Sequence, residues 1–180
     1  MLLKSNTQKV FTRFFEHPQK TFGLRELSRL SNISTTAAKK ALQELVKENM
    51  IKKLKVKPPV YQANSDYAKF KESKKVYTLN ILNESGLIDY IDEHLHRPEV
   101  IILFGSSARG EDIEKSDIDI FVLVSEKLDI DLLNFEKILK RNITLMQMTK
   151  EEFKRAKRKS PELINNIANG IIIKGYLEVI

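Results

Sequence analysis

Two acids in the second half of the sequence have the type and the spacing of metal ligands. Asp117 and Asp119 stand two residues apart in a run that is otherwise apolar from Ile118 to Val124. Residues two apart in a strand project from the same face, so the two carboxylates would lie side by side. Neighbouring carboxylates repel each other unless a cation lies between them, and hard oxygen ligands suit Mg²⁺ bridging to phosphate. The pair therefore predicts a site for Mg²⁺ or Mn²⁺.

The residues before these acids predict a phosphate site. Residues 100–104 are a short apolar run, as expected of a buried strand, and they lead directly into Gly105 and Ser106. Glycine lets the backbone approach a ligand closely, and the amides and hydroxyl of a Gly-Ser turn at a helix start suit phosphate oxygens. Gly110 allows a second sharp bend.

The complete pattern resembles the minimal nucleotidyltransferases of the polymerase-beta superfamily. Three residues separate Gly105-Ser106 from Gly110, and five more lead to Ser116-Asp117-Ile118-Asp119 and Val122. The resemblance covers about residues 87–180 and implies a mixed β-sheet flanked by helices. It also implies Mg²⁺-dependent transfer of a nucleoside monophosphate from a nucleoside triphosphate to an acceptor, with pyrophosphate leaving. In this family's terms, Asp117 and Asp119 would be the catalytic metal ligands, and the nucleotide would be held by Gly105, Ser106, Arg109, Gly110 and Ser116.

One position departs from the family pattern. Family members usually carry a third carboxylate on a later strand, expected within residues 143–149, and this chain has Thr144 there. A threonine hydroxyl is a weak neutral ligand and no base, so transfer would be impaired while triphosphate binding could survive. Another acid could substitute, although no spacing demands one of Asp129, Asp131 or Glu151.

The first half of the sequence predicts three helices followed by two short strands. Apolar residues recur at helical intervals in residues 5–16 and 23–30, and Ser34 can cap a third helix that ends near Asn49. Residues 52–57 alternate as a strand with lysines along one edge, Pro58-Pro59 would turn the chain, and residues 60–62 would return as a second strand. Together these segments resemble the winged helix-turn-helix family of DNA-binding domains, over most of residues 5–65.

The resemblance implies contacts with double-stranded DNA. A helix-turn-helix sets one helix in the major groove, and basic wing residues contact phosphate. The candidate groove contacts are Thr35, Thr36, Lys39, Lys40 and Gln43, and the candidate phosphate contacts are Lys52, Lys53, Lys55 and Lys57. Exposed lysines are often simply solvated, and winged helices also serve as protein-interaction modules. Charge favours DNA, because residues 1–75 hold 17 Lys and Arg against 6 Asp and Glu, whereas residues 76–180 hold 14 against 18.

The chain is thus predicted to have a mixed α/β (α+β) architecture in three parts. Residues 1–65 would be the winged helix-turn-helix domain, 66–86 a helical connector and 87–180 the nucleotidyltransferase-like domain. No apolar run approaches the roughly 20 residues of a membrane-spanning helix, and cysteine is absent. We therefore expect no membrane contact and a cytoplasmic location. A homodimer is also expected. The basic residues between Lys154 and Lys159 end a solvated helix or contact a second polyanion.

Three functional hypotheses follow. The first is a DNA-binding transcriptional regulator whose nucleotidyltransferase-like domain binds Mg-NTP, with catalysis impaired by Thr144. The second is an active nucleotidyltransferase that modifies a protein such as a partner toxin, an RNA or a small molecule. The third is an assembly module in which both domains make protein contacts.

Overall fold

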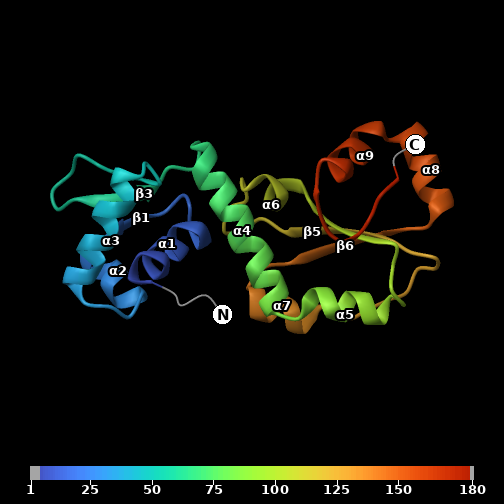
Figure 1. Cartoon of the computed structure of the whole chain (residues 1–180), viewed down its shortest axis with the longest axis horizontal. Helices are drawn as coiled ribbons and strands as arrows, with labels where there is room; N and C mark the ends of the chain where they lie inside the picture. Colours follow the sequence, from blue (N-terminus) through green and yellow to red (C-terminus); the bar gives the residue numbers. More distant parts are fainter. Residues whose placement is uncertain (1–4, 179–180) are drawn as a thin grey trace. The chain divides into compact units, whose positions relative to one another are not determined.

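The chain folds into two compact units with mixed helical and strand structure (Figure 1). The computed structural model describes residues 5–178. Unit 1 comprises Met1–Tyr77 and unit 2 comprises Thr78–Ile180. The division falls inside helix α4 (Ala68–Glu84), within the segment predicted as a helical connector. Residues 1–4 and 179–180, the outer ends of the two predicted domains, lie outside the described residues.

Unit 1 consists of short helices and a three-stranded antiparallel sheet. Its strands follow the order β1-β3-β2, and its elements before α4 are α1 (Asn6–Glu16), β1 (Thr21–Gly23), α2 (Leu24–Leu30), α3 (Thr35–Lys47), β2 (Ile51–Lys53) and β3 (Val60–Ala63). Side-chain caps start two helices: the Ser5 Oγ accepts from the Gln8 amide at 3.1 Å, and the Ser34 Oγ accepts from the Ala37 amide at 3.2 Å. Asn32, between α2 and α3, has a left-handed φ of 51°. The predicted cap at Ser34 is therefore confirmed, and Asn32 forms the turn that precedes it.

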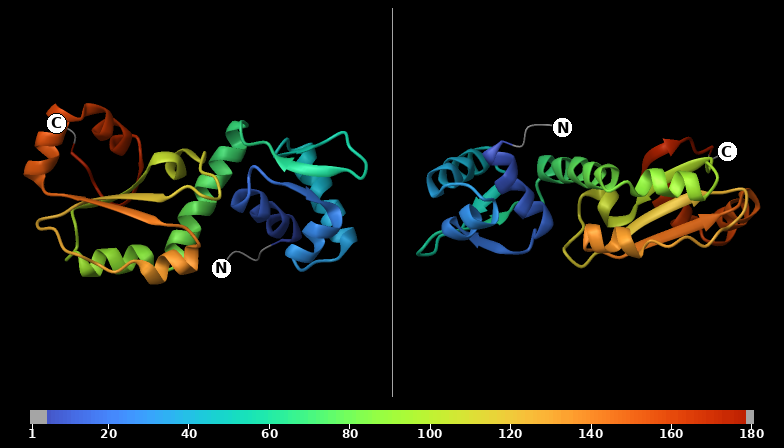
Figure 2. Two further views of the ribbon diagram at one scale, coloured as in Figure 1. Left: turned by 180° about the vertical axis from the view of Figure 1, so that it is seen from behind. Right: turned by 90° about the horizontal axis from the view of Figure 1, so that it is seen from below.

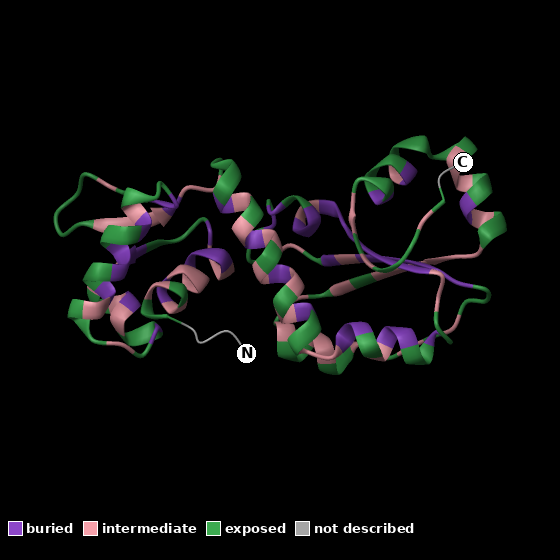
Figure 3. Ribbon diagram, viewed as in Figure 1, coloured by how far each residue is buried: buried purple, intermediate pink, exposed green. Residues whose placement is uncertain are grey.

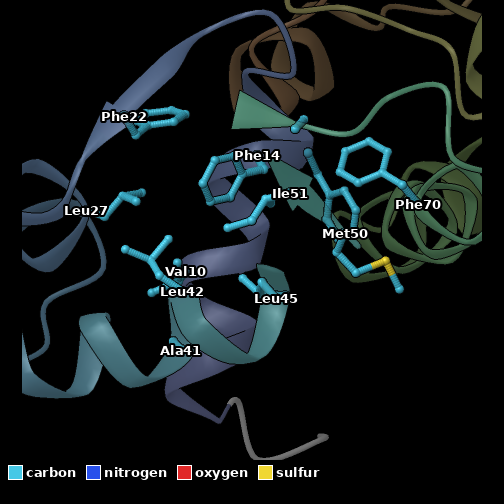
Figure 4. Close-up of a cluster of buried hydrophobic side chains, with 12 residues drawn as sticks. Val10, Phe14, Phe22, Leu27, Ala41, Leu42, Leu45, Met50, Ile51 and Phe70 are labelled. Atoms are coloured by element: carbon cyan, nitrogen blue, oxygen red, sulfur yellow. The ribbon is translucent and has the colours of Figure 1, made fainter. Parts of the chain in front are cut away.

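The core of unit 1 is built from the apolar faces of these helices (Figure 4). Phe14 and Phe22 are fully buried and meet edge to face, with ring centroids 5.3 Å apart. Ala41 and Leu42 bring the inner face of α3 into the same cluster. This packing fixes α3 by one side and leaves the opposite side to solvent.

One local prediction for unit 1 was wrong, and one strand was not predicted. The strand predicted for residues 52–57 ends at Lys53, because Pro58 and Pro59 carry no amide donor and pairing with β3 starts only at Val60. Leu54 still donates to the Val60 carbonyl at 2.9 Å, and the residues between them form a loop. The third strand, β1, was not predicted because a three-residue strand is too short to show a periodic pattern.

Unit 2 is built around a four-stranded mixed sheet. The strand order is β6-β5-β4-β7, with β4 antiparallel to β5 and β7, and β5 parallel to β6. The elements after α4 are α5 (Leu87–His94), β4 (Val100–Phe104), α6 (Gly105–Arg109), β5 (Ile118–Leu123), α7 (Leu133–Leu139), β6 (Ile143–Met148), α8 (Lys150–Lys159), α9 (Pro161–Ala168) and β7 (Ile171–Gly175). The predicted mixed sheet with flanking helices is confirmed.

Helices cover both faces of this sheet (Figures 1 and 2). Alternate residues of β5 face opposite ways: Ile118 and Ile120 join a core with α5 and α7, whereas Phe121 joins a core with α8 and α9. The two central strands are therefore almost wholly buried (Figure 3). No helix within the described residues is long and apolar enough to cross a membrane.

Candidate nucleotide and metal site

The candidate site lies where β4 ends and β5 begins. Phe104, the last residue of β4, is paired in register with Asp119 of β5. Gly105 follows with a left-handed φ of 71°, and a Cβ atom there would lie 3.2 Å from the Asp119 Cγ and overlap its Oδ2 atom. The Asp119 carboxylate therefore packs against the glycine-serine turn, and only glycine fits at position 105.

The two acids differ in environment. Asp117 is exposed and lies just before β5, whereas Asp119 is half-buried and belongs to the strand. Burial raises the pKa of the Asp119 carboxyl, and the charge of Asp117 raises it further, against smaller lowering effects of Arg141 and Arg109. Ionising the Asp119 carboxyl therefore costs free energy in the folded chain, partly because Asp117 lies nearby. A bound cation would offset that cost.

Arg141 organises the segment that carries these acids, and sequence analysis missed it. Its Nε donates to the Ser116 carbonyl at 2.7 Å, and one terminal nitrogen donates to the Asp117 carbonyl and to the Ser107 Oγ, each at 2.9 Å. The other terminal nitrogen forms a 2.9 Å ion pair with Asp112, and both side chains of that pair are largely buried. One guanidinium therefore ties helix α6 to both ends of the loop from Asp112 to Asp117.

The position of the expected third acid is next to the pair. In the parallel pairing of β5 with β6, Thr144 is the register partner of Asp119, so both side chains project from the same face. Asn142, two residues earlier, donates to the Asp117 Oδ1 at 3.2 Å. Across residues 5–178, no group of three or more His, Cys, Asp or Glu side chains could hold a metal ion. The idea that Asp129, Asp131 or Glu151 joins the pair to complete such a group is therefore wrong, and β6 brings a hydroxyl and an amide instead.

Comparison with known proteins assigns unit 2 to a family. The family model described as Polymerase beta, Nucleotidyltransferase matches residues 85–176, just over half of the chain. The chain belongs to this family. No curated protein and no solved structure matches it. The family supports nucleotidyltransferase-type activity in general, and unit 2 is called the nucleotidyltransferase unit below.

The other predicted nucleotide-binding residues of the nucleotidyltransferase unit have distinct positions. Ser106 is half-buried at the start of α6, and Gly110 ends α6 with a left-handed φ of 68°. The Ser116 Oγ accepts from the Ile113 amide at 2.9 Å, so this hydroxyl shapes the loop before the acids. Arg109 is exposed, forms a 2.9 Å ion pair with Glu111 and donates to Asn166 on α9 at 3.3 Å. Of these four residues, Ser106 is the one nearest in sequence to the Gly105–Asp119 contact.

The candidate DNA-binding residues all lie in unit 1 and are exposed or nearly so. The five predicted groove contacts, from Thr35 to Gln43, lie on the outer side of α3, opposite buried Ala38 and Leu42. Lys52 and Lys53 are exposed on β2, and Lys55 and Lys57 are exposed in the loop that follows. Among the described residues, none of the six lysines in this set forms an ion pair.

Proposed function

We propose that this protein is a DNA-binding regulator whose nucleotidyltransferase unit binds a nucleoside triphosphate with Mg²⁺, and whose transfer activity is impaired. The observation that carries the proposal is the register partner of Asp119, which is Thr144 rather than an acid. Two carboxylates suffice to anchor a metal-bound triphosphate, but a neutral hydroxyl adds little charge for activating an acceptor.

The residues around Gly105 fit a magnesium-bound phosphate chain. The Asp119 carboxylate, whose pKa is raised by burial and by Asp117, lies against the glycine that starts α6. Asp117 and Asp119 would hold the ion, and Gly105 and Ser106 would bind phosphate oxygens through backbone amides and the serine hydroxyl. When bound, the ion would neutralise charge on the phosphates. Arg141 keeps the Asp117 backbone in place for this role through its bonds to the two carbonyls.

The DNA-binding half of the proposal is supported by unit 1. Its order of three helices followed by a strand pair, with β1 completing the sheet, resembles a winged helix-turn-helix. The outer side of α3 presents Thr35, Thr36 and Lys39 at its start, where a recognition helix touches base edges. The lysines of β2 and its loop have no acidic partners among the described residues, so they are available to phosphate. That the protein is a cytoplasmic homodimer stays a prediction.

A second candidate is an active nucleotidyltransferase that modifies a partner protein, such as a toxin, or an RNA or small molecule. It is favoured by the intact contact between Gly105 and Asp119 and by the adjacent Asp117. These features are the ones needed to hold the reacting phosphates, and family membership makes transfer the default activity.

Label transfer separates the two. The full chain would be incubated with Mg²⁺, each α-labelled nucleoside triphosphate and a cell extract, beside the Asp119→Asn variant. We expect calorimetric binding of the triphosphate that weakens in Asp117→Asn, with no labelled acceptor. Label on an acceptor that disappears in Asp119→Asn would instead establish the active enzyme. Absence of any binding heat would favour the third hypothesis, in which both units serve as protein contacts.

A further inference from the structure

Unit 1 has a hollow at the turn between α2 and α3 that includes none of the predicted DNA contacts. Its volume is about 460 Å³, and it is lined by Arg25, Ser28, Arg29, Asn32, Ile33 and Ser34. Three of these side chains come from α2, and the rest come from the turn that leads into α3. The lining combines two guanidinium groups with hydroxyl and amide groups, which is the chemistry of an anion site.

The charge of this hollow is only partly offset within the described part of the chain. Arg25 and Arg29 are four residues apart on α2 and so lie on the same side of the helix. Both are exposed, and neither guanidinium forms a hydrogen bond or an ion pair among residues 5–178, although the charge of Arg29 helps to lower the pKa of the Glu26 carboxyl. Glu26, the acid between them, is paired with Lys20 at 2.9 Å. Two neighbouring guanidinium groups that form no ion pair favour an external anion.

The walls of the hollow are held in place. The Ser28 Oγ donates to the Ile33 carbonyl at 2.6 Å and clamps the turn, and Asn32 takes the left-handed conformation that the turn requires. Ser34 caps α3, a helix of 13 residues, so the amides of its first turn point back toward this side. The backbone of the turn is therefore formed before any ligand arrives, which reduces the entropy cost of binding.

We propose that this hollow binds a backbone phosphate of duplex DNA and sets the depth and register of α3 in the groove. The inference rests on the proposed DNA-binding function. Duplex phosphate is favoured over a free phosphate ion because the hollow adjoins Thr35 and Thr36, the candidate base contacts at the start of α3. Arg25 and Arg29 on one side of α3 and the wing lysines on the other would contact phosphates of both DNA strands.

The test is the salt dependence of duplex binding by the full chain. A labelled 30-base-pair duplex of mixed sequence would be titrated by fluorescence anisotropy at several salt concentrations. For Arg25→Ala with Arg29→Ala, we expect roughly tenfold weaker binding and a log–log salt slope that is smaller by about 1, the value for one lost phosphate contact. Arg25→Lys with Arg29→Lys should keep most of the slope. Lys137→Ala with Lys140→Ala removes equal charge from exposed positions in the other unit and should change neither quantity.

Three outcomes would contradict the inference in different ways. The Arg25 and Arg29 alanine variant could bind duplex with unchanged affinity and salt slope, while Lys39→Glu with Lys40→Glu abolishes binding. That result would refute phosphate binding by the hollow but keep the proposal of DNA binding. No duplex binding by the unmodified chain would overturn both. Thermal stabilisation by inorganic phosphate that depends on these arginines, with unchanged duplex binding, would identify a free-phosphate site instead. Circular dichroism of each variant checks that folding is intact.

Discussion

Replacing Thr144 with Asp should give the nucleotidyltransferase unit a three-acid metal site. Thr144 is the register partner of Asp119 on the neighbouring parallel strand, and its exposed side chain lies on the same face. Neighbouring strands are roughly 5 Å apart. A carboxylate at position 144 would therefore stand beside Asp119 and close to Asp117.

The expected magnitude follows from this spacing. Two unit charges about 5 Å apart repel by about 0.8 kcal/mol in water and about 3 kcal/mol at an effective dielectric constant of about 20. Position 144 is exposed and Asp119 is half-buried, so a value near 1 kcal/mol is expected. Thr144→Asp should thus lower the thermal midpoint of the metal-free unit by a few degrees. A divalent cation would remove this repulsion and gain a ligand, so its affinity should rise at least about tenfold, or about 1.4 kcal/mol.

The assay is titration with Mn²⁺ by calorimetry, together with thermal unfolding with and without the ion. Thr144→Asn is the matched control, because it has nearly the size of Asp without the charge. We expect the Asp variant to be less stable than the Asn variant without metal and to bind Mn²⁺ more tightly. If both variants bind Mn²⁺ equally, position 144 does not share a site with the two acids, and the explanation for impaired transfer fails. Label transfer that appears only in Thr144→Asp would support Thr144 as the cause of impaired transfer.

Four other changes test the remaining contacts. Burial and a neighbouring acid raise the pKa of Asp119, so its proton binds more tightly in the folded chain. The free energy of unfolding should therefore fall as pH rises from the unfolded pKa of about 3.9 through the raised pKa. Asp119→Asn should abolish this pH dependence in urea titrations and stabilise the metal-free chain at pH 7. Arg141→Ala breaks a largely buried ion pair and should cost about 3 kcal/mol, whereas an unchanged urea midpoint would contradict its organising role. Gly105→Ala should lower stability by at least about 1–2 kcal/mol and weaken triphosphate binding, because the new methyl group would displace Asp119; tight binding in this variant would refute the contact. Lys39→Glu with Lys40→Glu should abolish duplex binding in anisotropy titrations, and equal affinity would count against groove binding by α3.

The predictable parts of the site are those formed by residues that lie close together in the sequence. The strand before Gly105 and the strand around Asp119 are continuous apolar runs, and the motif between them has fixed spacing. The structure pairs Phe104 with Asp119 across those strands. Ser34 was predictable as a cap for the same reason, since a cap acts on amides three residues away.

Arg141 shows why the rest could not be predicted. It acts on the Ser116 and Asp117 carbonyls, 25 and 24 residues earlier, and on Ser107, 34 residues earlier. No local period marks a residue whose partners are backbone carbonyls of a distant loop, because any sequence supplies those carbonyls. Helix α7 was not predicted either. It has no buried residue and exposes Leu133 and Ile138 to solvent, so its sequence has no clear apolar face.

The energetics of the two acids argue for ligand binding even where transfer is impaired. Asp119 is costly to ionise in the folded chain, and the position it packs against tolerates only glycine in a left-handed conformation. Features that cost stability are expected at functional sites, where a ligand offsets them. A chain that had lost nucleotide binding as well as the third acid would gain stability from a neutral residue at position 119. We therefore expect Mg²⁺ with a non-hydrolysable triphosphate to raise the thermal midpoint of the natural chain more than that of Asp119→Asn, and an equal rise in both would show that the acid is retained for another reason.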